Sequence, residues 1–175
     1  MMKEIASRLV VFTMFLGFCL TGWNSRVAAQ TNQPGKATKA STPAAAEPLQ
    51  VQETNTEGVV AEFMECKRKE GVLSVKIRFR NTGAAPASIS LLVYGRGYDR
   101  IYFTAEGTKY YILKDEDGNW LAPGTDPSGS LGFSLQKGKI FLWWAKYPAP
   151  PAAVKKITLF TTVTGPFEDI PITDP

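Results

Sequence analysis

Histidine is absent from this chain of 175 residues. Its absence removes the commonest general base, the usual activator of a nucleophile and the preferred ligand of transition metals. The stretch GSLGF, at residues 129–133, also lacks the Gly-x-Ser-x-Gly elbow on which many serine hydrolases depend. We therefore expect a non-enzymatic protein that needs no metal and no cofactor.

Cysteine is scarce, with residues at Cys19 and Cys66 alone. Cys19 lies in an N-terminal segment that we expect to be removed, so Cys66 would have no cysteine partner in the folded chain. A single cysteine excludes an internal disulfide, and stability must then come from packing. We expect Cys66 to be buried as a small hydrophobic residue, with an intermolecular disulfide as the alternative.

The N-terminal apolar run, residues 9–23, is shorter than the roughly 20 residues that a membrane-spanning helix needs. Positive residues precede it, and Val27 and Ala29 place small side chains at the two positions that a signal peptidase reads. This pattern predicts a secretory signal peptide at residues 1–29, with cleavage before Gln30.

An uncleaved membrane anchor and a lipoprotein attached through Cys19 are the alternatives at this N-terminus. The first would favour a longer apolar run, and the bulky Phe18 argues against the second. We therefore expect an exported protein, periplasmic or extracellular, with no stable membrane span after signal cleavage.

Positive charge is small once the signal peptide is set aside. The chain has a net charge of +4, and residues 1–29 hold three cations and one anion, which leaves +2 for the remainder. A charge this low, spread over the rest of the chain, forms no basic patch. We expect no nucleic-acid partner.

Aromatic residues are missing from residues 30–50, QTNQPGKATKASTPAAAEPLQ, in which Ala, Thr, Pro, Lys and Gln dominate. Such a segment buries too little apolar surface to offset the entropy of ordering, so we predict a disordered linker. The folded domain is then predicted at residues 51–175.

No part of that domain keeps a helical period of 3.6. In VLSVKIRFRN, apolar residues alternate with polar ones from Leu73 to Phe79, which is typical of a half-buried strand. Gly71 and Gly107 each separate two such runs and predict hairpin turns. The spacing favours an all-β fold, an immunoglobulin-like antiparallel β-sandwich of seven or eight strands, and a small barrel is the alternative.

The densest acidic cluster is KDEDGNW at residues 114–120. Asp115, Asp117 and Asn119 could offer oxygen ligands to calcium, but the glycine and glutamate of a calcium loop are missing. Asp117 and Gly118 form a strong hairpin signal. We predict a turn here and no metal site.

One apolar row, IFLWW from Ile140 to Trp144, is apolar on both faces of a strand. One face must enter the core, and the favoured prediction is that the following YPAPP segment covers the other. The alternative is an exposed surface for a protein partner, where Trp and Tyr are enriched. The candidate partner-binding residues are Trp143, Trp144, Tyr147 and Pro148.

A second candidate surface comes from aromatic residues around the loop YGRGYDR, residues 94–100. Tyrosine and tryptophan rings can stack on sugars, so these residues could bind a glycan or another small ligand. The candidate ligand-binding residues are Tyr94, Tyr98, Tyr102 and Trp120.

The segments LGFSL, FLWWAKYPAPPAAVKKITL and PFEDIPI resemble a block found in exported bacterial β-sandwich domains of unknown function. They are similar to the N-terminal domains of some OmpA-family cell-envelope proteins, and the resemblance covers about residues 59–172. It implies a non-catalytic envelope module. No sequence follows Pro175, so we expect no peptidoglycan-binding OmpA-type domain here, and no family binding residue is carried over.

Two functions follow from the sequence. The leading prediction is a non-enzymatic, exported envelope protein that acts as a protein-protein interaction module with an envelope protein partner. The alternative is a glycan-binding or small-ligand-binding module of the cell envelope. One sandwich fold serves both functions, so the fold does not separate them.

Overall fold

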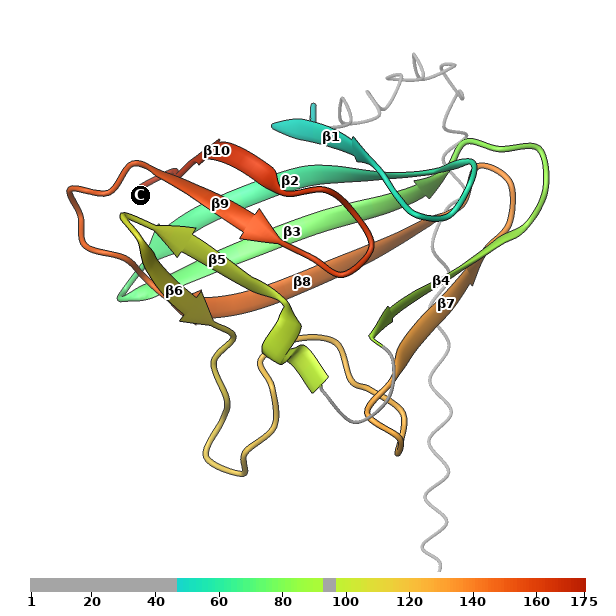
Figure 1. Ribbon diagram of the computed structural model, residues 1–175. Helices are drawn as coiled ribbons and strands as arrows, with labels where there is room; N and C mark the ends of the chain where they lie inside the picture. The colour runs from blue at the N-terminus through green and yellow to red at the C-terminus, as the bar shows by residue number, and fades with distance from the viewer. Residues whose placement is uncertain (1–46, 93–96) are drawn as a thin grey trace, which may run out of the picture. The chain divides into compact units, whose positions relative to one another are not determined.

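The structure is a computed structural model that describes residues 47–92 and 97–175 (Figure 1). The predicted signal peptide, residues 1–29, and most of the predicted linker, residues 30–50, lie outside the described residues. Within the described ranges, no helix is long and apolar enough to cross a membrane. The one helical element described there is a 3-10 turn, η1 (Gly97–Arg100).

Apolar residues at every second position give β3 one buried face, and its pairing with β2 and β8 makes it an inner strand of the first sheet. Leu73, Val75, Ile77 and Phe79 are all fully buried, and the residues between them face outward. The sheet has the order β1-β2-β3-β8, and every pairing in it is antiparallel. Its strands are β1 (Gln50–Glu53), β2 (Val59–Lys69), β3 (Val72–Asn81) and β8 (Ile140–Pro148).

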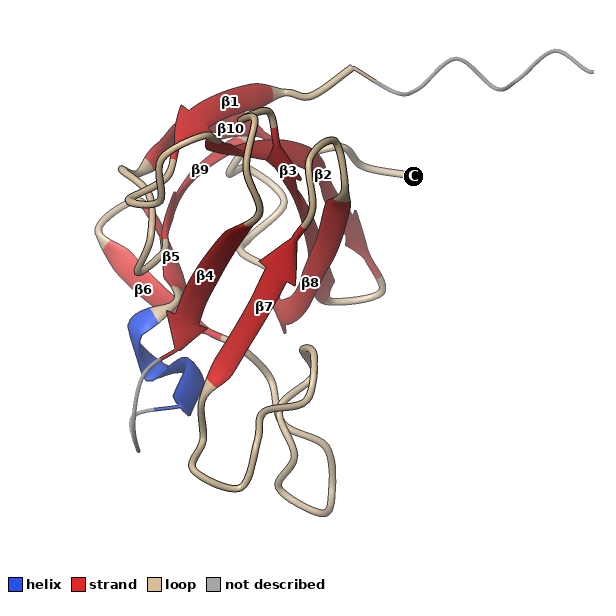
Figure 2. Cartoon of the chain, turned by 90° about the vertical axis from the view of Figure 1, so that its right-hand side faces the viewer, coloured by secondary structure: helices blue, strands red, loops and turns tan. Residues whose placement is uncertain are grey.

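A second antiparallel sheet has the order β10-β9-β5-β6, and β4 pairs with β7 as a separate ribbon. Figure 2 shows this ribbon crossing in front of the space between the two larger sheets, with β7 on the side of β8. The strands are β4 (Ala87–Leu92), β5 (Tyr102–Ala105), β6 (Thr108–Tyr111), β7 (Leu131–Leu135), β9 (Lys156–Phe160) and β10 (Phe167–Pro171).

Aromatic rings join the layers in the core. Phe63 on β2 meets Phe167 on β10 edge to face, with ring centroids 5.3 Å apart. On β7, Phe133 lies 4.0 Å from the Phe141 ring of β8, and this stacked pair seats the β4–β7 ribbon against the first sheet. Such pairs contribute about 0.5–1.5 kcal/mol beyond the area that they bury.

Two glycine hairpins occur where the sequence predicts them. Glu70 and Gly71, between β2 and β3, have φ angles of 51° and 77°. Glu106 and Gly107, between β5 and β6, have φ angles of 49° and 77°. Positive φ at both central residues is the type I′ geometry, whose twist matches that of the flanking strands.

The all-β prediction is confirmed, because the strands form antiparallel sheets that pack face to face. Ten strands are described, where the sequence predicts seven or eight. One addition is β1, which begins at Gln50, inside the predicted linker, and is too short to give a clear alternating pattern. The segment GNWLAPG, residues 118–124, forms no strand, and Trp120 makes an isolated bridge with Lys114. The immunoglobulin-like assignment stays a prediction.

Candidate functional site

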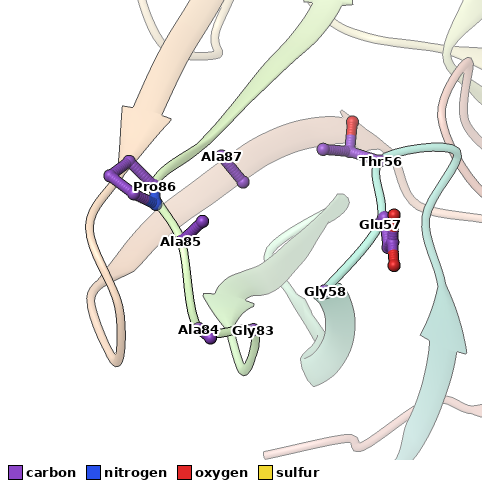
Figure 3. Close-up of a pocket in the computed structure, with 8 residues that line it drawn as sticks. All are labelled: Thr56, Glu57, Gly58, Gly83, Ala84, Ala85, Pro86 and Ala87. Atoms are coloured by element: carbon purple, nitrogen blue, oxygen red, sulfur yellow. The ribbon is translucent and has the colours of Figure 1, made fainter.

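A pocket of about 470 Å³ lies between the β1–β2 and β3–β4 loops (Figure 3). Glu57 is its one ionisable side chain, so the pocket holds no pair of groups that could act as acid and base. Two of its lining residues, Gly58 and Gly83, approach so closely that a Cβ atom added to Gly58 would lie 2.9 Å from the Gly83 Cα. The lining is Thr56, Glu57, Gly58, Gly83, Ala84, Ala85, Pro86 and Ala87.

Two of the four predicted partner-binding residues lie in the core. Trp143 and Tyr147 are on the inner face of β8, with exposed fractions of 1% and 0%. Trp143 lies 6.5 Å from the Tyr98 ring, and Tyr147 meets Phe103 edge to face at 5.2 Å. Burial raises the pKa of Tyr147 well above its ordinary value. The prediction that these two side chains contact a partner is wrong, because the period of the strand turns both inward.

The other face of β8 is open. Ile140, Leu142 and Trp144 have exposed fractions of 55%, 48% and 38%, and we call these three residues the β8 outer row. Pro148, at the end of the same strand, is also exposed. Trp144 therefore remains a surface candidate, and Ile140 and Leu142 join it. The favoured prediction that the YPAPP segment covers this face is wrong.

Arg68 on β2 explains where that proline segment goes instead. Its Nη1 donates hydrogen bonds of 3.0 Å and 2.7 Å to the carbonyl oxygens of Pro150 and Pro151. Its Nη2 donates to the carbonyl oxygen of Val154 at 2.6 Å, and its Nε lies 3.0 Å from a carboxylate oxygen of Asp174. These contacts tie the segment to β2, beyond the end of β8.

The β8 outer row stays uncovered because its neighbours on β3 lean away from it. Lys76 stands opposite Trp144, but its Nζ lies 2.9 Å from a carboxylate oxygen of Glu65 on β2. Arg78 and Arg80 stand opposite Leu142 and Ile140 in the ladder. Both guanidinium groups donate hydrogen bonds to Glu62 on β2. The charged ends of all three side chains are thus held on the side away from β8.

Glu62 is the electrostatic centre of this outer face, with an exposed fraction of 2%. Burial by itself raises the pKa of its carboxyl group, but hydrogen bonds and charge from Arg80 and Arg78 outweigh burial. The pKa of Glu62 is therefore lowered from its ordinary value of 4.5. Two cations on one anion leave this cluster with an excess positive charge.

The β8 outer row also lies on a free strand edge. In an antiparallel strand, alternate residues direct their N–H and C=O groups to the same edge. Lys146 directs its groups away from β3, where its N–H donates to Leu121 at 3.0 Å and its C=O accepts from Leu113 at 2.8 Å. The backbone N–H and C=O groups of Ile140, Leu142 and Trp144 point to this same edge. None of these groups has a backbone partner there among the residues described.

The predicted ligand-binding residues do not form one surface. Tyr98 is buried, and its hydroxyl donates to the carbonyl oxygen of Pro123 at 2.6 Å. Burial raises the pKa of Tyr98 to about 12. Trp120 packs edge to face on Tyr98 at 6.1 Å and is half-buried. Tyr94 lies outside the described residues. Tyr98 therefore packs in the core, and the prediction that its ring is one of four that bind a ligand is wrong.

Tyr102 belongs to another aromatic cluster, on the outer face of the second sheet. Its ring stacks on Phe160 at 5.1 Å and lies 5.9 Å from Tyr111. The Lys109 Nζ stands 4.5 Å above the Tyr102 ring. Phe160 and Tyr111 were not predicted from the sequence, although the Gly107 hairpin fixes the register that pairs Tyr102 with Tyr111. We call Tyr102, Tyr111 and Phe160 the second-sheet aromatic cluster.

The acidic stretch KDEDGNW forms the predicted turn. Asp115 Oδ1 accepts hydrogen bonds from the backbone N–H groups of Asp117 at 3.0 Å and Asn119 at 2.8 Å. Hydrogen bonds, first that of the Asn119 side chain, lower the pKa of Asp115. The carboxylate is thus used to close its own turn. Across the described parts of the chain, no group of three or more acidic, His or Cys side chains could hold a metal.

Two side chains of nucleophilic type, Cys66 and Ser134, lie in surroundings that do not activate them. Cys66 is free and buried on the inner face of β2, and burial raises the pKa of its thiol to about 12. Such a thiol is a poor nucleophile. Ser134 and Lys137 have a Ser-x-x-Lys spacing, but Ser134 lies on β7 and its hydroxyl hydrogen-bonds that of Ser88 at 2.8 Å.

Comparisons with protein-family models, curated proteins and solved structures found no match to this chain.

Proposed function

We propose that this chain is a non-enzymatic, exported protein of the cell envelope that works as a protein-protein interaction module through the β8 outer row. The observation that supports it is the row of Ile140, Leu142 and Trp144 on a free strand edge. Contiguous apolar surface on a protein is typical of a contact site, and an unpaired edge offers backbone groups to a second strand.

The energetics of the row favour association. Complete burial of a large apolar side chain stabilises by about 1.5–3 kcal/mol, so a residue that is half exposed can still contribute roughly 1 kcal/mol in a complex. Nearby Arg78 and Arg80 are anchored to Glu62 and cannot fold over the row without losing those hydrogen bonds. The row is therefore held open for a partner at little cost to the fold.

Export rests on the N-terminal pattern and on the resemblance to envelope domains. If residues 1–29 are a signal peptide, the exported protein begins at Gln30. Mass spectrometry of the protein recovered from a cell-envelope fraction tests this directly. A product that keeps Met1, or a lipid-modified Cys19, would replace the periplasmic assignment with one of the two anchored alternatives.

The contact surface is tested by photo-cross-linking in intact cells. A photoreactive amino acid at Trp144 should give discrete cross-linked protein bands. Val51, on the outer face of β1 at the opposite edge of the same sheet, is 50% exposed and provides the matched control. Bands from the Val51 position alone, or from neither position, would contradict a contact at β8.

A second candidate function is glycan binding, and the second-sheet aromatic cluster favours it. Tyr111 has an exposed fraction of 47%, and its neighbours Tyr102 and Phe160 are half-buried, so their rings offer a surface on which a sugar could stack. Calorimetric titration with soluble envelope glycan fragments should then show binding that Tyr111→Ala removes. A flat titration of the unmodified protein would count against this function.

A further inference from the structure

We propose that the partner of the β8 outer row is a second copy of this chain, and that the two β8 strands pair antiparallel about a twofold axis at Leu142. This inference rests on the proposed function and names its partner. The two β1-β2-β3-β8 sheets would then join into one continuous sheet, with β8 beside β8.

The free backbone groups support this register. Each copy has three residues, Ile140, Leu142 and Trp144, whose N–H and C=O groups point to the open edge. With Leu142 opposite Leu142, Ile140 of one copy stands opposite Trp144 of the other, and all of these groups are paired. A shift in either direction leaves one of them facing Lys146, which is already bonded, or the turn before the strand.

The ends of the open edge fit the length of the strand that would occupy it. At one end, Leu113 and Leu121 occupy the edge at Lys146. At the other end, the chain turns into β8 at residues 136–139, where the Lys139 N–H donates to the Gln136 carbonyl oxygen at 2.9 Å. In the proposed register Gly138 of the second copy meets Lys146, so the incoming strand turns away where the edge is already taken.

The side chains match in the same register. The outer row of one copy lies directly beside that of the other, with Ile140 beside Trp144 and Leu142 beside Leu142. Six exposed apolar side chains thus become one shared patch, which buries surface that each copy leaves in water. A twofold contact requires such a self-complementary surface.

Charge allows the pairing. The cations nearest to the row on β8 and its turn are Lys139 and Lys146. In the proposed register Lys139 stands opposite Ala145, and Lys146 stands opposite Gly138, so no two cations face each other directly. Arg78 and Arg80 lie one strand further away and share the negative charge of Glu62.

Disulfide trapping tests the register in the full chain. Leu142→Cys, made in a Cys19→Ser background, should form a disulfide-linked dimer on mild oxidation. The Cα atoms of a hydrogen-bonded antiparallel pair lie about 5.5 Å apart, which is within the range for a disulfide. The parent protein, which retains the buried Cys66, should stay monomeric on a non-reducing gel.

Matched variants separate pairing from random collision. Trp144→Cys alone should trap less dimer than Leu142→Cys, whereas a mixture of Trp144→Cys and Ile140→Cys should trap a mixed dimer. Val51→Cys, which is equally exposed on the other edge of the sheet, should trap none. Equal trapping at Val51 and Leu142 would overturn the inference. Circular dichroism confirms that each variant is folded.

Sedimentation of the protein without new cysteines gives a second measurement. We expect a concentration-dependent dimer, and Trp144→Lys should weaken it at least tenfold, while Val51→Lys should not. A monomer at all concentrations, without Leu142 trapping, overturns self-pairing. If photo-cross-linking at Trp144 then captures a different protein, the proposed function stands without the second copy. If it captures nothing, both fail.

Discussion

The guanidinium group of Arg68 donates a 2.6 Å hydrogen bond to the carbonyl oxygen of Val154, across 86 positions of sequence. Together with its bonds to two proline carbonyl oxygens, this contact fixes the segment that follows β8 against β2. The segment is therefore unable to fold back over Trp144. A single buried cation thus decides that the outer face of β8 is open to a partner.

Removal of this cation should destabilise the fold. Arg68→Ala removes the hydrogen-bond donor of three carbonyl oxygens, and these oxygens are then left buried or partly buried without that donor. A hydrogen bond to a charged group contributes about 1.5–3 kcal/mol, so we expect a loss of roughly 3 kcal/mol in the free energy of unfolding. Urea denaturation measures it, and Arg68→Lys should recover only part, since an ammonium group lacks the planar fork.

The control for that change is Lys69→Ala, at the next position on β2. The Lys69 side chain is 66% exposed, and its contact with Glu70 is a surface ion pair. We expect less than about 0.5 kcal/mol of change. If Arg68→Ala unfolds at the same urea concentration as Lys69→Ala, the carbonyl contacts do not hold the segment.

Glu62 should make the stability of the fold depend on acid. Its pKa is lowered in the folded protein, so its contribution is fully present above the ordinary pKa of 4.5 and is lost as pH falls through the folded value. Unfolding free energies measured from pH 7 down to pH 3 should therefore decline more steeply for the unmodified protein than for Glu62→Gln.

Glu168→Gln provides the comparison for Glu62→Gln, because Glu168 is exposed on β10 and has no resolved ion pair among the described residues. Its pH dependence should match that of the unmodified protein. A Glu62→Gln protein with an unchanged pH dependence would mean that the two arginines do not depend on the ionised carboxylate.

The fold was accessible from sequence because its signals are local. Alternation in β3 identifies a half-buried strand without any knowledge of its neighbours, and Gly71 and Gly107 fix two hairpins through positive φ. The β4–β7 pairing is different, since its strands are separated by residues 93–130 and their contact depends on long-range packing of Phe133. That arrangement has no local signature.

Only half of the site could be predicted from the sequence, because local patterns do not report long-range packing. Period-two alternation correctly separates Trp143 from Trp144, but both faces of IFLWW are apolar, and the pattern does not say which one enters the core. That choice depends on Phe103 and Tyr98, which come from other elements. The position of the proline segment against β2 depends on Arg68. The charge of this residue suggests, from sequence, a surface position, whereas the side chain is buried.

Gly58 should resist substitution because two loops meet there. It has a φ of 74°, and an added Cβ would lie 2.9 Å from the backbone of Gly83. Gly118 has a similar φ of 83°, with open space around it. Gly118→Ala should cost about 1 kcal/mol from backbone strain, and Gly58→Ala distinctly more. Thermal unfolding compares the two, and equal melting temperatures would show that the loops separate freely.

The adjacent tryptophans offer the sharpest contrast between core and surface. Trp143 has an exposed fraction of 1% and packs near Tyr98, whereas Trp144 has an exposed fraction of 38% and projects from the outer face. Trp143→Ala should destabilise the fold by about 3–5 kcal/mol, since it opens a cavity in the core. Trp144→Ala should change stability by less than about 0.5 kcal/mol.

The two variants should also differ in what they do to association. With the photoreactive amino acid placed at Leu142 in both variants, Trp144→Ala should keep a native circular dichroism spectrum and lose the cross-links that depend on the β8 outer row. Trp143→Phe, which retains most of the core packing, should keep both the spectrum and the cross-links. If Trp144→Ala unfolds while Trp143→Phe loses only its cross-links, the two faces of β8 have been assigned the wrong way round. The face that holds Trp143 would then be the contact surface.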